Sequence, residues 1–72
     1  MTMIPTVIQV NGQAEPLEAA SVAELLAARG IGADTPAIAV ALNGAVVRRA
    51  RWADTPLNAG DQLDIVRPFQ GG

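Results

Sequence analysis

The stretch Leu57-Asn-Ala-Gly-Asp-Gln-Leu-Asp-Ile-Val66 decides how this chain is arranged. Its Gly-Asp pair is a turn signal, and the turn leads into a strand predicted over residues 62–66. Side chains alternate between the two faces of a strand, so Leu63 and Ile65 are expected to face a core. Only residues 67–72, Arg-Pro-Phe-Gln-Gly-Gly, follow. The sequence therefore predicts a final strand that runs directly into a short tail.

A hairpin is predicted at the other end of the chain. The β-branched run Thr6–Val10 leads into Asn11-Gly12, and Asn-Gly between two strands favours a type I′ turn because both residues tolerate positive φ. The return strand is expected over residues 13–17. Pro16 cannot donate a backbone hydrogen bond, which assigns this strand to a sheet edge.

A short helix is predicted next. Ser21 with Glu24 three residues later forms the capping-box pattern of a helix start. Gly30 is suited to the position just after the last helical residue, and Ile31 is placed to contact Leu26 in a Schellman ending. The apolar stripe that includes Leu26 is expected to belong to the core.

The segment between the helix and the final strand is predicted to hold one more hairpin. Residues 37–42 alternate large and small apolar side chains, and Asn43-Gly44 turns the chain into a strand over 45–48. A loop is expected around Trp52, a residue that is more often packed than exposed in a domain of this size.

These elements define an α+β domain, since one short helix would cross one face of a mixed sheet of four to five strands. With the first strand beside the last, the arrangement is the β-grasp, or ubiquitin-like, fold. We expect residues 1–66 to form the domain and residues 67–72 to form a flexible C-terminal tail.

Composition excludes several classes of function. The chain has 72 residues, half of them hydrophobic, and no cysteine or histidine, so it has no thiolate nucleophile, no imidazole proton shuttle and none of the usual soft metal ligands. Its seven carboxylates are scattered without metal-loop spacing. We therefore expect a protein that other enzymes act on, with no bound cofactor, and not an enzyme.

Charge and hydropathy narrow the partners further. The net charge of −2 lacks the basic footprint of a nucleic-acid binder. No apolar run approaches the roughly 20 residues that a bilayer requires, and the first residues lack the basic flank of a secretory signal. The expected protein is cytoplasmic, monomeric when free and bound to neither nucleic acid nor membrane.

The Gly71-Gly72 end suggests where the chemistry lies. Glycine has no Cβ, so two glycines in succession let a backbone enter a narrow channel. On this interpretation the functional group is the α-carboxylate of Gly72. Diglycine alone is also common at termini without a chemical role. The residues that precede it are therefore needed to distinguish a functional terminus from an inert one.

Those residues resemble the ThiS family of sulfur carrier proteins of thiamine biosynthesis. The similarity rests on Val10-Asn-Gly12, on Asn43-Gly-x-Val-Val47, on Arg51-Trp52, and on the run from Leu57 through Asp61 to Gly72. The segment Val-Arg-Pro-Phe-Gln-Gly-Gly at its end is the most family-specific part. The Leu-x-x-Gly-Asp turn is shared by many β-grasp domains and supports the fold only.

The resemblance implies that a ThiF-like adenylating enzyme uses ATP to activate Gly72, that a cysteine desulfurase system supplies sulfur, and that thiazole synthase receives it. Phe69 is interpreted as an exposed anchor, because an aromatic side chain in a short polar tail is more often a contact residue. The candidate site residues are Gly72 for sulfur attachment, Gly71 and Gln70 for threading, and Phe69, Pro68, Arg67 and Val66 for partner binding.

Three alternatives remain open from the sequence. The small subunit of molybdopterin synthase has the same fold and the same diglycine chemistry. A ubiquitin-like modifier joined to lysines of other proteins would also end in diglycine. The third alternative is an interaction module whose tail has no chemical role.

Overall fold

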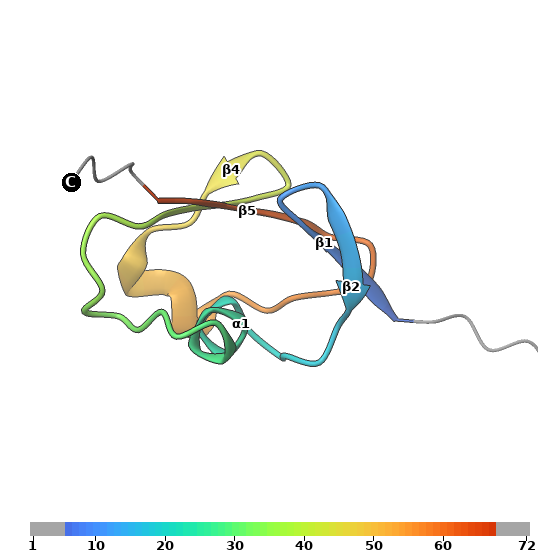
Figure 1. The fold of residues 1–72 in the computed structure, drawn as a ribbon, viewed down its shortest axis with the longest axis horizontal. Coiled ribbons are helices and arrows are strands. Elements are labelled where there is room, and N and C mark those ends of the chain that lie inside the picture. Colours follow the sequence, from blue (N-terminus) through green and yellow to red (C-terminus); the bar gives the residue numbers. More distant parts are fainter. Residues whose placement is uncertain (1–5, 68–72) are drawn as a thin grey trace, which may run out of the picture.

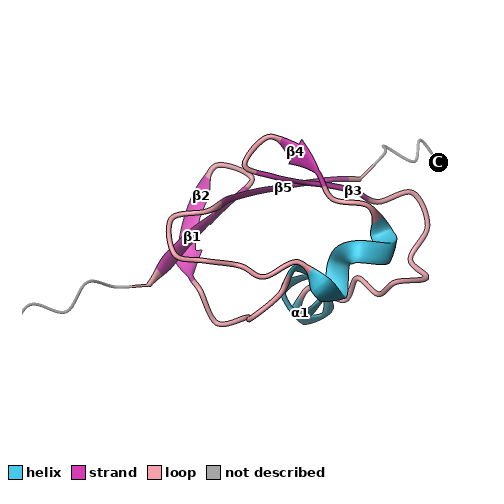
Figure 2. Ribbon diagram, turned by 180° about the vertical axis from the view of Figure 1, so that it is seen from behind, coloured by secondary structure: helices cyan, strands magenta, loops and turns pink. Residues whose placement is uncertain are grey.

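The computed structural model describes residues 6–67 of the chain. It contains a five-stranded sheet with the strand order β2-β1-β5-β3-β4. The α-helix and a 3-10 helix, η1, lie on the same side of this sheet (Figures 1 and 2). In chain order the elements are β1 (Val7–Val10), β2 (Gln13–Pro16), α1 (Val22–Ala28), β3 (Ala39–Leu42), β4 (Ala45–Val46), η1 (Arg49–Asp54) and β5 (Gln62–Val66).

The final strand lies at the centre of the sheet. β5 pairs with β1 in parallel, with Val10 opposite Leu63, and with β3 antiparallel, with Val40 opposite Ile65. The β1–β2 and β3–β4 pairs are antiparallel hairpins. This mixed sheet with one α-helix across one face confirms the α+β, β-grasp prediction. Pro16 lies in the edge strand β2, as its missing N–H requires.

The core fills the space between the sheet and the two helices. Leu63 of β5 and Leu26 of α1 are both fully buried and belong to the same cluster. Burying an aliphatic side chain of this size contributes about 1.5–3 kcal/mol. The cluster of buried residues consists of Ile8, Val10, Val22, Leu25, Leu26, Ile31, Val40, Trp52, Leu57 and Leu63.

Both predicted ends of the helix are confirmed. At the start, the Ser21 hydroxyl accepts a hydrogen bond from the backbone N–H of Glu24 at 3.2 Å. At the end, Gly30 has a φ of +81°. Its N–H donates to the Ala27 carbonyl at 3.0 Å, while the Ile31 N–H donates to the Leu26 carbonyl at 2.9 Å. This pair of bonds is the Schellman motif.

The segment from residue 37 to residue 54 differs from the prediction. β3 begins at Ala39 and not at residue 37, because Ala37 has a φ of +61° and cannot lie in a strand. β4 is only two residues long. The expected loop is instead the 3-10 helix η1, which packs against α1.

Trp52 explains why η1 forms where a loop was expected. Its side chain is 3% exposed, and its Nε1–H donates to the Val47 carbonyl at 3.1 Å. The structural role predicted for this residue is confirmed. No helix within residues 6–67 is long and apolar enough to span a bilayer.

Candidate functional site: the root of the tail and the outer sheet face

Strand β5 leads into the predicted site, residues 66–72. Val66 is the last residue of the strand, and Arg67 is the last residue that the structure describes. Pro68, Phe69, Gln70, Gly71 and Gly72 lie outside the described residues, so the roles assigned to them stay predictions.

The end of β5 is held on both sides. Val66 is still in register with Ala39 of β3. On the other side, the Asn11 N–H donates to the Leu63 carbonyl at 2.9 Å, and the Asn11 Oδ1 accepts from the Ile65 N–H at 2.7 Å. The Asn11 side-chain oxygen thus accepts a hydrogen bond from β5 beyond the last paired residue of β1, where the β1 backbone turns away and no longer pairs with β5. We call this bond the Asn11 clamp.

The second Asn-Gly turn does the same at the start of β5. The Asn43 Oδ1 accepts from the Gln62 N–H at 2.9 Å, and its Nδ2 donates to a carboxylate oxygen of Asp61 at 3.1 Å. The other oxygen of Asp61 accepts from the Asn58 N–H at 2.9 Å. Both asparagines have a φ of +51°. The two turns therefore fix the strand that carries the tail, a role that the turn prediction did not include.

Four apolar side chains and the carboxylate of Asp64 lie on the outer face of the sheet, beside Arg67. Because Val40 is buried, its strand neighbours Ala39 and Ala41 face outward. Ala39 lies opposite Val66, and Ala41 lies between Val46 of β4 and the exposed Asp64 of β5. Val66 is 58% exposed and Val46 is 77% exposed, and these two are the exposed large hydrophobic residues within 6–67. We call Ala39, Ala41, Val46 and Val66 the outer patch.

The sequence predicts Val66 as a partner-binding residue but gives no such role to Val46. β4 was expected to run to residue 48, and Val46 was not assigned to either face. The signal was nonetheless present, because the turn at Asn43-Gly44 fixes the register and places Val46 opposite the outward-facing Ala41.

The arginines of η1 are used locally. The Arg49 guanidinium stacks over the Trp52 ring at 4.6 Å from its centroid and donates to the Ala33 carbonyl at 2.7 Å. Arg51 approaches Asp54 at 3.9 Å, but both side chains are 71% exposed, so this pair contributes little to stability. Arg49 therefore has a structural role, whereas Arg67 lies directly at the tail root.

Fold and site together define a small ubiquitin-like domain whose central strand leads into a diglycine tail. The family model of the ThiS family matches residues 6–72, which is nearly the whole chain. The chain belongs to the ThiS family, the sulfur carrier proteins of thiamine biosynthesis.

Two solved structures from Geobacter metallireducens are similar over most of their length. A crystal structure of a thiamine biosynthesis protein, ThiS, shares 30% identity with a TM-score of 0.72, covering 92% of this chain and 99% of that one. An NMR solution structure of a thiamine biosynthesis protein shares 30% identity with a TM-score of 0.73, covering 92% of this chain and 87% of that one. No curated protein matches.

Proposed function

We propose that the carboxylate of Gly72 is adenylated, converted to a thiocarboxylate, and used as the sulfur source for thiazole formation. The observation that carries this proposal is the extent of the family match, which runs through residue 72 and so includes the diglycine tail. The expected partners are an ATP-dependent ThiF-like adenylating enzyme, a cysteine desulfurase system and thiazole synthase. ATP is a substrate of the activating enzyme and not a cofactor of this chain.

The chemistry balances without any side chain of the carrier. A carboxylate oxygen of Gly72 attacks the α-phosphorus of ATP and displaces pyrophosphate. The terminal sulfur of a persulfide on the donor then attacks the acyl carbon and AMP leaves, which gives an acyl disulfide. A second thiol attacks the donor's sulfur and breaks the S–S bond, so that the thiocarboxylate is released, the two thiols are oxidised to a disulfide, and one oxygen of the terminus is replaced by sulfur. An acyl-adenylate is easily hydrolysed, and the partner must therefore enclose it in a site that excludes water.

The tail has the reach that this requires. Residues 67–72 are six residues and span at most about 20 Å when extended. The partner can therefore enclose Gly72 while the domain stays outside. Because its last two residues have no Cβ atoms, the tail can enter a narrower channel than one with side chains at those positions.

The outer patch is the surface that we expect to dock on the partner. It begins at Val66, one residue before the tail root, and extends across β3 to Val46. Exposed apolar side chains gathered on one face are typical of interaction sites. Docking through this patch would orient the end of β5 toward the channel of the activating enzyme.

The test is ATP–pyrophosphate exchange catalysed by the purified activating enzyme of the same organism. We expect exchange with the wild-type chain and a loss of most exchange with Gly72→Ala, because the added methyl group obstructs the channel. Thermal unfolding should be unchanged in that variant. Normal exchange by Gly72→Ala would contradict the threading argument, and no exchange by the wild-type chain would contradict the proposed function.

A further inference from the structure

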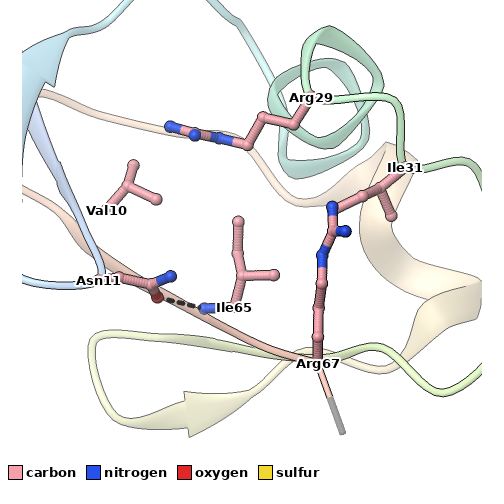
Figure 3. A pocket seen from close by; sticks show the side chains of 6 residues that line it. All are labelled: Val10, Asn11, Arg29, Ile31, Ile65 and Arg67. Carbon is pink, nitrogen blue, oxygen red and sulfur yellow. Dashed lines mark hydrogen bonds between the residues drawn. The ribbon is translucent and has the colours of Figure 1, made fainter. Parts of the chain in front are cut away.

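A hollow lies on the inner side of the sheet, at the point where the tail begins. It has a volume of about 320 Å³. Figure 3 shows Arg29, from the end of α1, with its guanidinium on the side of Val10, and Arg67, which follows β5, with its guanidinium on the side of Ile31, so that the two side chains flank Ile65. The lining residues are Val10, Asn11, Arg29, Ile31, Ile65 and Arg67. Segments far apart in sequence therefore place two guanidinium groups at one hollow.

The base of the hollow is apolar. Val10 is 5% exposed and Ile31 is 2% exposed, and Ile65 is half-buried. The Oδ1 atom of Asn11 is occupied by the Ile65 N–H. A ligand that fits this surface combines an apolar stem, to cover Ile65, with a negative end, to meet the guanidinium groups.

The positive charge of the hollow is only partly compensated. Arg29 forms an ion pair with Glu15 of β2, and each of these side chains is about one-third exposed (36% and 35%). Within residues 6–67, no carboxylate forms an ion pair with Arg67. Two cations and one anion leave a net attraction for a further carboxylate.

We propose that this hollow receives an aspartate or glutamate side chain of the activating enzyme, which pairs with Arg67 and Arg29 at the mouth of the channel. The inference rests on the proposed function. If the tail threads into the partner, only the five residues 68–72, at most about 17 Å of chain, separate Arg67 from the reacting carboxylate. Arg67 is then held against the partner surface that surrounds the channel. The ion pairs fix the register between the domain and the channel.

A variant of Glu15 distinguishes a partner-binding role of Arg29 from a purely structural one. If Arg29 matters because it binds the partner, Glu15 competes for it, and Glu15→Gln should bind the partner as tightly as wild type or more tightly. If Arg29 matters only because it ties β2 to α1, Glu15→Gln and Arg29→Met should weaken binding equally.

The experiment measures the Kd of the full chain for the purified activating enzyme by calorimetric titration, at low and at high ionic strength. We expect Arg29→Met and Arg67→Met each to raise the Kd about tenfold, since hydrogen bonds to charged groups are the stronger ones. The double variant should lose less than the product of the two losses, because one carboxylate serves both arginines. The salt dependence of the Kd should fall in each variant. Arg48→Met and Arg51→Met, at arginines outside the hollow, are the matched controls and should bind as wild type does.

Three results would overturn the proposal. One is an unchanged Kd in both variants, and another is equal weakening by Arg29→Met and Glu15→Gln. The third is tighter binding by Arg67→Met, which would indicate that the hollow holds the terminal carboxylate of the chain itself. Each result leaves the proposed function intact as long as the wild-type chain supports pyrophosphate exchange. A wild-type chain that neither binds nor is adenylated would contradict both.

Discussion

The Asn11 clamp is expected to stabilise the end of β5. Replacing Asn11 by alanine removes the oxygen that accepts the Ile65 N–H at 2.7 Å and leaves alanine at a φ of +51°. The lost hydrogen bond should cost about 1 kcal/mol, and the left-handed conformation about 1 kcal/mol more. The sum, about 2 kcal/mol, is a large part of the roughly 4–11 kcal/mol expected for a domain of this length.

Two further variants separate the contribution of the hydrogen bond from that of the positive φ. Asn11→Gly accepts the positive φ but lacks the acceptor, so about 1 kcal/mol should be lost. Asn11→Asp retains the acceptor oxygen and should stay close to wild type. Urea unfolding of the full chain gives the free energy of unfolding, and thermal unfolding should show a decrease of about 10 °C in Tm for Asn11→Ala.

Hydrogen exchange tests the clamp at a single atom. The Ile65 amide should exchange faster in Asn11→Ala and Asn11→Gly than in the wild type or in Asn11→Asp. If the Ile65 amide is equally protected in all four proteins, the side-chain bond does not hold the end of β5 and the reasoning is refuted.

The remaining predictions concern docking and the core. Val46→Asp should weaken binding to the activating enzyme without lowering Tm, because Val46 is 77% exposed; a calorimetric titration showing wild-type affinity would remove the outer patch from the interface. Phe69→Ala should likewise weaken binding to the activating enzyme or thiazole synthase at constant Tm, whereas a large fall in Tm with unchanged affinity would assign Phe69 to the core. Leu63→Ala should cost 2–5 kcal/mol in urea unfolding, because a fully buried side chain leaves a cavity, and a loss below about 1 kcal/mol would show that β5 is not the centre of the core.

Turns and helix ends could be predicted from the sequence where the local residues favour a single backbone conformation. The Asn-Gly pairs require positive φ, and Gly30 closes the helix by a fixed set of backbone bonds. The segment that became η1 gave no such signal. Its conformation depends on the burial of the Trp52 side chain in a cluster with residues of α1. It also depends on the stacking of the Arg49 guanidinium over the Trp52 ring.

The same distinction applies to the site. Val66 and Arg67 could be proposed as site residues because they directly precede the segment Pro-Phe-Gln-Gly-Gly in sequence. Val46, Arg29 and the clamping role of Asn11 depend on which strands become neighbours. Asn11 and Ile65 are 54 residues apart in the chain, and only the parallel β1–β5 pairing brings them together. The proposed chemistry could therefore be inferred from the residues at the terminus, whereas the proposed docking surfaces depend on which strands pair in the sheet.

Sulfur carriage by Gly72 can be tested by the intact mass of the full chain, isolated from its own cells and fragmented to locate any change. We predict a population whose mass has gained the difference between one sulfur and one oxygen atom, located at Gly72. A chain that is unmodified in the cell, and that stays unmodified after incubation with the activating enzyme, ATP and a sulfur donor, would contradict sulfur carriage.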